Sequence, residues 1–352
     1  MSENKREIDE ARQEIQKVDA QLFALLERRA QASARLGELR PGTAVLPASA
    51  EAFAREKTTP LLDPRAVRDV YRSIIAACAP LESPSQVAFC GVDGTGTHAA
   101  ARSKFGAGTT LHPFETTERA LEEVARSRVS FAVVPYETRP YGPVDATIRA
   151  LVAHDLRIVS CFEVAENVHL ASKTGNPQDI EQIYATPQEH AASAQFIATE
   201  FPKARVVDVR FPQLAVELAA EDHGAAALAY HAFAEDHGLV TVRANVRDAG
   251  DERIRYAVVG PRPTSRTGDD LTAIVFSVHD APGALHEVLR RFAEREISLT
   301  KIESRPNAGD AWVYLFFLEI VGHVTDRHVV TALEDVKRTT KFFKVLGSYA
   351  RE

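Results

Sequence analysis

The chain has 352 residues, of which 45% are hydrophobic and 26% are charged, and its formal net charge is −7. This length predicts two or three domains, and the composition is that of an ordinary globular protein. The negative charge argues against a general nucleic-acid partner, and no apolar run is long enough to cross a membrane. The charged, helical start is unlike a secretory signal, and the three cysteines lack metal-site spacing, so we expect reduced thiols in a cytoplasmic protein.

The first 84 residues are predicted to be helical. Apolar residues recur at helical spacing from Ile8 to Leu36, and Gly37 and then Pro41-Gly42 end this long helix. Two shorter helices are expected over residues 49–56 and 64–79. So long an apolar stripe cannot be buried within 84 residues, so we expect an all-α bundle that pairs with a second chain.

A glycine-rich turn, GVDGTGTH (residues 91–98), follows a buried strand at 87–90 and precedes a helix predicted over 99–105. Backbone N–H groups at such a helix start can hold an anion. The turn fits neither the dinucleotide-binding pattern nor a phosphate loop, so it is a weak signal by itself. None of the 12 histidines forms a metal-ligand pair, and His98 is expected to pin this turn rather than to transfer protons.

Strands and helices continue to alternate up to residue 263. A buried strand at 131–135 carries Glu137-Thr138-Arg139 at its C-terminal end, where ligands bind in open α/β sheets. An extended run over 157–169 is long enough to cross between two lobes. Further strands are expected at 183–186, 205–209, 225–229 and 256–260. We therefore predict a two-lobed α/β domain with a ligand cleft over residues 85–263.

The C-terminal segment has the order β-α-β-β-α-β, which is typical of a ferredoxin-like α+β unit. Strand patterns at 271–278, 297–304, 312–321 and 342–346 alternate with two helical patterns. Pro282-Gly283-Ala284 lies where a strand turns into a helix, and Glu303-Ser304-Arg305-Pro306 closes another strand. Together these segments could hold the carboxylate and the ammonium of a free amino acid. The alternative is a helix cap and an ordinary turn.

The C-terminal motifs resemble the ACT regulatory domain of prephenate dehydratases. GAL, then ESRP and then W-x-Y-x-F-F carry the resemblance. It implies an L-phenylalanine site at the interface of a dimer, in a domain over residues 264–352. The residues implied for this site are Gly283, Ala284, Leu285, Glu303, Ser304 and Arg305.

Residues 85–263 resemble the dehydratase domain of the same family. The glycine turn matches G-P-x-G-T-F-S-H-x-A-A, VPYETRPYGPV (134–144) matches V-P-I-E-N-S-x-x-G-x-V, and S-H-P-Q is reduced to Thr186-Pro187-Gln188. The resemblance implies a fold like that of periplasmic binding proteins, prephenate as substrate, and no cofactor. The implied catalytic residues are Thr95, Thr97, Thr138 and Arg255, and the implied substrate contacts are Gly94, Glu137, Arg139, Gln188 and Ile254.

The departures from this family pattern fall on the expected chemistry. The family's Asn-x-Thr-Arg-Phe is Glu252-Arg253-Ile254-Arg255-Tyr256 here, so the residue thought to assist the departing hydroxyl has no donor. The arginine, interpreted as a carboxylate binder, is kept as Arg255. Thr95, Thr97 or Thr138 could supply the donor instead, and Arg139 could bind a carboxylate. Alternatively, the site decarboxylates prephenate and keeps the hydroxyl.

The first 84 residues resemble the all-helical chorismate mutases, in which cationic side chains hold the two carboxylates of chorismate. The matching residues are Arg12, Arg29, Arg40 and, from the motif that begins the second helix, Glu51. Pro47 and Ala50 replace the other two residues of that motif. Because loss of an arginine should impair the reaction severely, a dimerisation bundle with solvated arginines is the alternative to a mutase.

The chain is therefore identified as a member of the bifunctional chorismate mutase/prephenate dehydratase family, with degenerate catalytic motifs. We expect a lyase that converts prephenate to phenylpyruvate, with phenylalanine as effector and chorismate as a second substrate, in a homodimer or homotetramer. A catalytically silent phenylalanine-binding regulator and a decarboxylase are the alternatives. The expectation depends on Arg255 and the glycine turn lining one cavity.

Overall fold

The computed structural model describes residues 2–40, 44–48, 61–83, 85–138, 142–249, 252–307 and 310–351. The chain divides into two compact units, Met1–Ser85 with Arg102–Thr110, and Gln86–Ala101 with Leu111–Glu352. The domain boundaries expected after residues 84 and 263 stay predictions. Within the described residues, no helix has the length and apolar character needed to cross a membrane.

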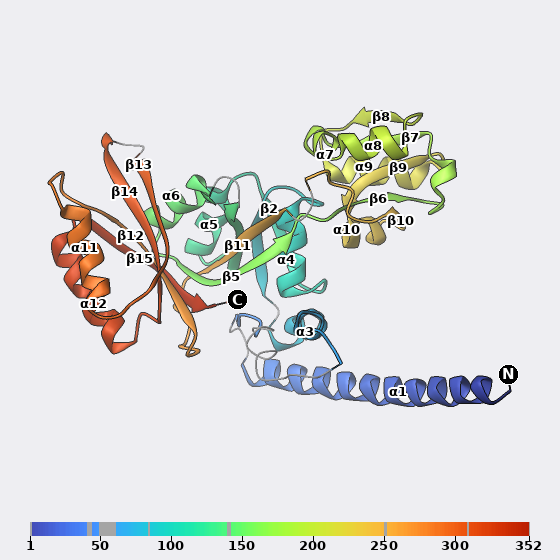
Figure 1. Ribbon diagram of the computed structural model, residues 1–352, viewed down its shortest axis with the longest axis horizontal. Coiled ribbons are helices and arrows are strands. Elements are labelled where there is room, and N and C mark those ends of the chain that lie inside the picture. The colour runs from blue at the N-terminus through green and yellow to red at the C-terminus, as the bar shows by residue number, and fades with distance from the viewer. Residues whose placement is uncertain are drawn as a thin grey trace. The chain divides into compact units, whose positions relative to one another are not determined.

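The described part of the first unit is built on two helices that pack against each other (Figure 1). The long helix expected at the start is confirmed as α1 (Ser2–Leu39), and α3 (Pro64–Glu82) confirms the helix expected at 64–79 and continues through Pro80. Gly37 lies against the carbonyl oxygen of Leu81, and Ser33 donates a 2.8 Å hydrogen bond to Glu82. These contacts join the C-terminal ends of the two helices. The helix expected at 49–56 lies outside the described residues.

The first lobe of the second unit is a mixed sheet in the order β2-β1-β3-β11-β5, with β4 paired to β3. β1 and β3 are parallel, whereas β11 is antiparallel to both of its neighbours. Val87, Phe89 and Val133 are fully buried, which explains why β1 and β3 are continuously apolar. The elements of this lobe are β1 (Gln86–Cys90), α4 (Gly96–Phe105), β2 (Thr110–Phe114), α5 (Thr117–Ala125), β3 (Phe131–Thr138), β4 (Gly142–Pro143), α6 (Asp145–Ala153), β5 (Arg157–Ala165) and β11 (Arg253–Gly260).

The second lobe contains a five-stranded sheet in the order β10-β6-β9-β7-β8. The chain enters it from β5 to β6 and returns from β10 to β11, and the Glu166 N–H donates to the carbonyl of Glu252 where the two crossings meet. The two-lobed prediction is confirmed. The elements are β6 (Val168–Ser172), η1 (Pro177–Asp179), β7 (Gln182–Ala185), α7 (Pro187–Ala192), α8 (Ala194–Glu200), β8 (Arg205–Asp208), α9 (Pro212–Glu221), β9 (Ala225–Tyr230), α10 (His231–Asp236) and β10 (Val240–Arg243).

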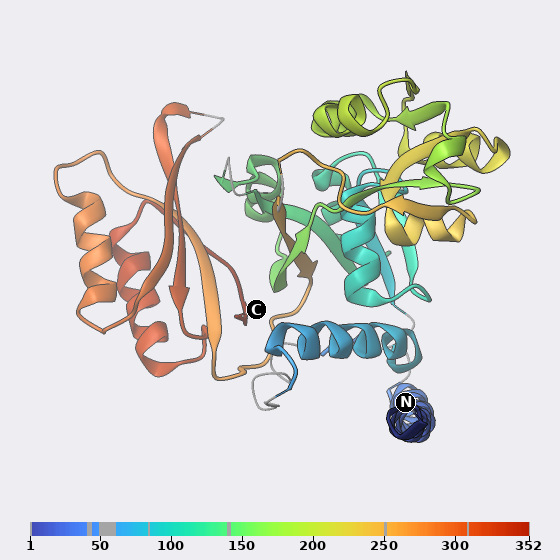
Figure 2. The same cartoon turned by 45° about the vertical axis from the view of Figure 1, so that its right-hand side comes forward.

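The C-terminal segment forms the predicted β-α-β-β-α-β unit, an antiparallel sheet in the order β13-β14-β12-β15. Both of its helices cover the same face of the sheet, as Figure 2 shows. The core on that face includes Phe276, Phe292, Leu318 and Val336. The elements are β12 (Asp270–Ser277), α11 (Ala284–Ala293), β13 (Leu299–Asn307), β14 (Asp310–Val321), α12 (Arg327–Thr339) and β15 (Phe342–Ala350).

The other face of this C-terminal sheet packs against the first lobe. One hydrophobic cluster includes Tyr136 and Ile158 of the lobe together with Phe317 and Tyr349 of the C-terminal sheet. Gly347 touches the backbone of Ile158, so a Cβ at this position would collide with main-chain atoms that cannot move aside. The C-terminal domain and the first lobe therefore share a core.

Candidate functional site

His98 holds the glycine-rich turn between β1 and α4. The Gly94 N–H donates to Nδ1 of His98 at 2.9 Å, and the imidazole stacks on Phe89 with ring centroids 5.1 Å apart. Gly94 has a φ of +84°, and a Cβ there would lie 2.6 Å from the Phe233 ring. The contact with Gly94 confirms that His98 pins the turn, since its Nδ1 accepts the backbone N–H of the turn itself.

The threonines expected to act as donors are differently placed. The Thr95 hydroxyl donates to the Val92 carbonyl at 2.8 Å, so it stabilises the turn itself. Thr97 is buried, and its side chain lies beside the hydroxyl of Tyr256. Thr138 ends β3, where it pairs with Ile254 of β11. Of these three threonines, Thr97 is therefore the one whose side chain lies beside a side chain of the motif at residues 252–256.

A carboxylate that the sequence analysis missed lies where the two lobes meet. Glu166 follows β5 and is 7% exposed. Tyr256 of the first lobe donates a 3.0 Å hydrogen bond to its Oε1, and Tyr230 of the second lobe donates to its Oε2. A Cβ on Gly96 would lie 2.7 Å from Oε1, so the carboxylate touches the first residue of α4. The helix start expected to bind a substrate anion is contacted by a carboxylate of the chain itself.

At the same junction, Arg247 lies near Glu166 and near the carboxylates of two more glutamates. Its guanidinium lies 2.8 Å from Glu252, 3.3 Å from Glu189 and 3.9 Å from Glu166. Burial raises the pKa of Glu189, Arg247 opposes the shift, and the two other glutamates add to it. Burial and Glu166 also raise the pKa of Tyr230 and Tyr256, which keeps both hydroxyls protonated as donors. A charged residue inside the extended run over 157–169 was the signal that could have pointed to Glu166.

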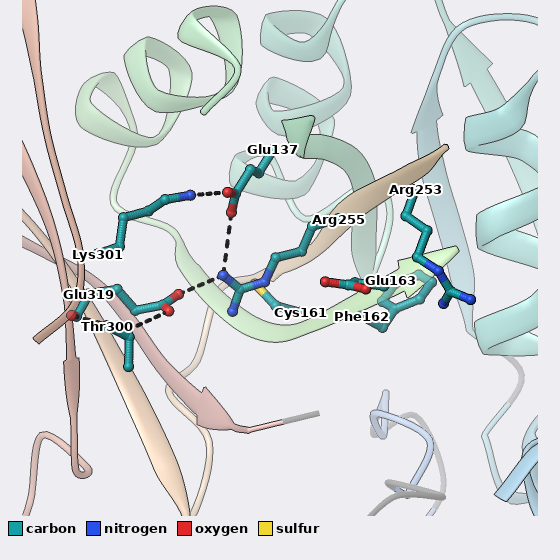
Figure 3. Close-up of a pocket in the computed structure, with 9 residues that line it drawn as sticks. All are labelled: Glu137, Cys161, Phe162, Glu163, Arg253, Arg255, Thr300, Lys301 and Glu319. Carbon is teal, nitrogen blue, oxygen red and sulfur yellow. Dashed lines mark hydrogen bonds and ion pairs between the residues drawn. The ribbon is translucent and has the colours of Figure 1, made fainter. Parts of the chain in front are cut away.

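The two faces of β11 carry different parts of the degenerate motif. Its register with β5 is regular from Arg253 to Val258, so successive side chains alternate between faces. Tyr256 reaches Glu166 on one face, and the same alternation places Ile254 there. Arg253 and Arg255 line a cavity on the other face (Figure 3).

That cavity has a volume of about 240 Å³ and lies between the first lobe and the C-terminal sheet. The Arg255 guanidinium points to two carboxylates, at 2.8 Å from Glu319 and 3.5 Å from Glu137 (Figure 3). Lys301 forms an ion pair with Glu137 from the opposite side. The cavity is lined by Glu137, Cys161, Phe162, Glu163, Arg253, Arg255, Thr300, Lys301 and Glu319.

This geometry corrects one expectation. Among the residues that the structure describes, none from the glycine turn lines the cavity that contains Arg255. Arg255 is expected from the sequence to bind a carboxylate beside that turn, but strand alternation and the packed C-terminal sheet turn its guanidinium the other way. Glu137, expected among the substrate contacts, also faces this cavity. Arg139 lies outside the described residues, and Gln188 is exposed on α7.

The segments expected to bind an amino acid occupy different positions in the C-terminal domain. Gly283, with a φ of +81°, precedes α11, whose first residues are Ala284 and Leu285. Glu303 lies 3.7 Å from Lys301, 3.1 Å from Arg305, and close to Gly142 of the first lobe. Arg305 in turn lies 3.5 Å from Asp145. Ser304 is exposed on β13. Glu303 and Arg305 therefore face the first lobe.

The candidate mutase residues are spread along α1. Arg12 is exposed and lies 3.8 Å from Asp9 of the same helix. Arg29 reaches α3, where it donates to the Ile74 carbonyl at 3.5 Å and lies 4.0 Å from Glu82. Arg40 follows the last turn of α1, and its N–H donates to the Gly37 carbonyl. Glu51 lies outside the described residues. Within the described ranges, no group of three or more side chains could hold a metal ion.

Protein families of known function match both the two-lobed domain and the C-terminal domain. Residues 87–264 match the prephenate dehydratase family model, and residues 272–338 match that of the ACT domain. The bifunctional chorismate mutase/prephenate dehydratase of Aquifex aeolicus is 34% identical over 98% of both chains. That of Pseudomonas aeruginosa is 33% identical over 82% of this chain and 80% of its own. A prephenate dehydratase from Arthrobacter aurescens, solved in complex with L-Phe, has a TM-score of 0.64 at 30% identity, covering 76% of this chain and 90% of its own.

A two-lobed α/β domain of the prephenate dehydratase type joined to an ACT domain defines a class of enzymes with an attached regulatory domain. The chain belongs to the bifunctional chorismate mutase/prephenate dehydratase family, because the match to the relative from Aquifex aeolicus runs through the N-terminal helices, the dehydratase domain and the ACT domain.

Proposed function

We propose that this protein converts prephenate to phenylpyruvate, water and carbon dioxide, and that L-phenylalanine inhibits the reaction. The observation that carries the proposal is the full-length relationship to a bifunctional relative at 34% identity. The test is to incubate the purified full chain with prephenate and to follow phenylpyruvate with and without phenylalanine. Formation of phenylpyruvate that phenylalanine suppresses is the expected result, and absence of product would overturn the assignment.

The chemistry requires the protein to hold a dianion and to help a hydroxide leave. As the bond to the ring carboxylate breaks, its electrons enter the ring, carbon dioxide departs, and the hydroxide takes up a proton to become water. Aromatisation drives these changes, and a positioned proton donor typically contributes about 10²–10⁴ in rate. Ile254 has no donor. The neighbouring hydroxyls of Thr97 and Tyr256 support their assignment as the groups that assist the hydroxide.

Decarboxylation without dehydration is the second candidate, and the hydrocarbon side chain of Ile254 favours it. In that reaction the ring keeps its hydroxyl, so carbon dioxide is released without phenylpyruvate. One assay that reports both products separates the two reactions. Phenylalanine binding by calorimetry, without either product, would instead favour a silent regulator.

The finer assignment of the effector site is also a proposal. We assign phenylalanine to the segment Gly283–Leu285 and to Glu303, Ser304 and Arg305, with the two groups supplied by different protomers. The solved relative with bound L-Phe and the match to the ACT domain support this assignment. Calorimetry with Glu303→Gln should show at least about tenfold weaker binding, because the ion pair to the ammonium is lost.

The exposed apolar face of α1 supports a dimer. Ile15, Leu22 and Phe23 are 60%, 53% and 70% exposed, although their spacing is that of a buried stripe. We propose that a second copy of α1 covers them, and that Arg12, Arg29, Arg40 and Glu51 form any mutase site there. Leu22→Glu should shift the molar mass measured in solution toward that of a smaller species. Lys17→Glu, on the same helix, is the charge control: it makes the helix more negative by two charges instead of one and should leave the mass unchanged.

A further inference from the structure

We propose that Arg255 is a positioning residue that couples the effector site of the ACT domain to the motif strand β11. The inference rests on the proposed function, since it explains how phenylalanine would control the dehydratase site. It assigns to the motif arginine the task of transmitting a structural change, and it places the transmitting contacts in the charged cavity of Figure 3.

Arg255 is anchored to the ACT sheet by a buried carboxylate. Glu319 of β14 is 3% exposed and lies 2.8 Å from the Arg255 guanidinium. The same carboxylate accepts hydrogen bonds from Tyr349 of β15 at 2.7 Å and Thr300 of β13 at 2.8 Å. Its position is therefore set by three strands of the ACT sheet, and a movement of that sheet must move Glu319 and its arginine together.

A series of alternating charges connects this anchor to the expected effector residues. Arg255 also contacts Glu137, which is paired with Lys301 of β13. Lys301 lies 3.7 Å from Glu303, and Glu303 lies 3.1 Å from Arg305. Successive members have opposite charge, so each side chain is held by its neighbours on both sides. Phenylalanine brings an ammonium and a carboxylate to this end of the series, and these charges compete for Glu303 and Arg305.

The other end of the series is the face of β11 that meets the junction of the lobes. Arg255 lies between Ile254 and Tyr256, and Tyr256 binds Glu166 against the start of α4. The register with β3 shifts between Arg255 and Tyr256, because Tyr136 is an extra residue of β3 at this point, whereas the pairing of β11 with β5 stays regular. Arg255 and Tyr256 are consecutive residues of one strand, so a displacement of Arg255 also moves the backbone that carries Tyr256, beside this irregularity in β3.

The competing interpretation is that these charges only hold the ACT domain against the first lobe. Lys344 provides the matched control, because its Nζ also joins the two domains, donating to the carbonyls of Val152 at 3.0 Å and His154 at 2.6 Å. It is not a member of the charge series. Lys301→Met and Lys344→Met each remove one lysine from the same domain contact, but only the first interrupts the series.

The experiment measures phenylalanine binding, basal turnover and inhibition in the full-length protein. Lys301→Met should keep the basal kcat and the KM for prephenate within about twofold and phenylalanine affinity within about fivefold. The inhibition reached at saturating phenylalanine should fall to less than about half of that in the wild type. Lys301→Arg should restore inhibition. Lys344→Met should remain inhibited like the wild type. Unchanged inhibition in Lys301→Met, or equal loss in both methionine variants, would overturn the proposal.

A second readout needs no turnover. Amide hydrogen exchange of the peptide that contains Ile254–Tyr256 should change when phenylalanine is added to the wild type and to Lys344→Met, but not to Lys301→Met. Phenylalanine that binds the wild type without altering this peptide would overturn the coupling and leave the proposed activity standing. Absence of phenylalanine binding would overturn the effector role and the coupling together, whereas absence of turnover with an altered peptide would overturn the dehydratase assignment alone.

Discussion

The hydroxyl of Tyr256 donates a 3.0 Å hydrogen bond to Oε1 of Glu166, which ties the motif strand to the junction between the two lobes. The adjacent residue, Arg255, is tied in the opposite direction to Glu319 of the ACT sheet. One short segment of β11 thus contacts both the expected cleft and the regulatory domain. This arrangement explains how a motif could serve catalysis and control through neighbouring residues on opposite faces.

Restoring a hydroxyl at position 254 tests the dehydratase chemistry. Ile254→Thr should raise the rate of phenylpyruvate formation by at least about tenfold, because a positioned donor can then assist the departing hydroxide. Ile254→Val is the control, since valine has the shape of threonine but no hydroxyl. Parallel measurement of carbon dioxide and phenylpyruvate gives the partition between products. Equal rates in the Thr and Val variants would rule out a missing donor as the limitation.

Local patterns in the sequence were sufficient for the β-α-β-β-α-β order of the C-terminal segment and for His98, but they did not predict β2 or α5. The strand, glycine turn and helix are consecutive in the chain, and the Gly94–His98 contact spans four residues. The Glu166 cluster could not be predicted in this way, because Tyr230 is 64 residues and Tyr256 is 90 residues away along the chain. Hydrophobic patterning does not identify partners at such separations.

Arg255 shows a different limit of the sequence. Alternation along β11 predicts that Arg255 and Tyr256 lie on opposite faces, but it does not say which neighbour covers each face. That depends on how the ACT sheet packs on the first lobe, through Phe317, Tyr349 and the close approach of Gly347 to Ile158. The family resemblance identifies which residue corresponds to the motif arginine. It does not say toward which neighbouring domain the side chain points.

The charge of Glu166 should weaken binding of a dianionic substrate. Glu166→Gln keeps an oxygen that accepts from a tyrosine and removes a negative charge from the start of α4. A charge about 8 Å away contributes roughly 2 kcal/mol at an effective dielectric constant of about 20, so we expect the KM for prephenate to fall by about thirtyfold. Steady-state kinetics at low ionic strength measures this effect.

Tyr230→Phe is the control for Glu166→Gln, because it removes one hydrogen bond to the carboxylate and leaves the charge in place. Its KM for prephenate should not fall. A KM for Glu166→Gln that is unchanged or higher than that of the wild type would show that the carboxylate does not oppose the substrate.

The contributions of Arg255 and Glu319 to the free energy of unfolding should depend on each other. Arg255→Met leaves the Glu319 carboxylate buried without its counter-charge, and breaking such a pair typically costs about 3–5 kcal/mol in the free energy of unfolding. Adding Glu319→Gln removes the stranded charge and keeps acceptors for Tyr349 and Thr300, so the double variant should recover part of the loss. Denaturant unfolding measures both values, and an additive cycle would contradict the expected coupling.

His169 should make the second lobe less stable in mild acid. Burial, followed by the charge of nearby His231, lowers the pKa of His169, and the two rings have centroids 5.5 Å apart. A histidine with a lowered folded-state pKa takes up its proton more readily when the chain is unfolded. Its neutral form therefore favours the folded state above the unfolded pKa of about 6.5, and this contribution is lost as the pH falls through that value toward the lowered pKa.

The measurement for His169 is the difference in unfolding free energy between the wild type and His169→Gln from pH 7.5 to pH 5. A glutamine at position 169 does not titrate in this range, so the wild type should lose stability relative to the variant as the pH falls. The loss should be less than about 1 kcal/mol, because solvent screens the charge on a half-buried ring. His231→Gln removes the nearby charge and should shift this loss to a higher pH interval with a smaller amplitude. A difference that stays constant between pH 7.5 and pH 5 would show that His169 titrates alike in both states.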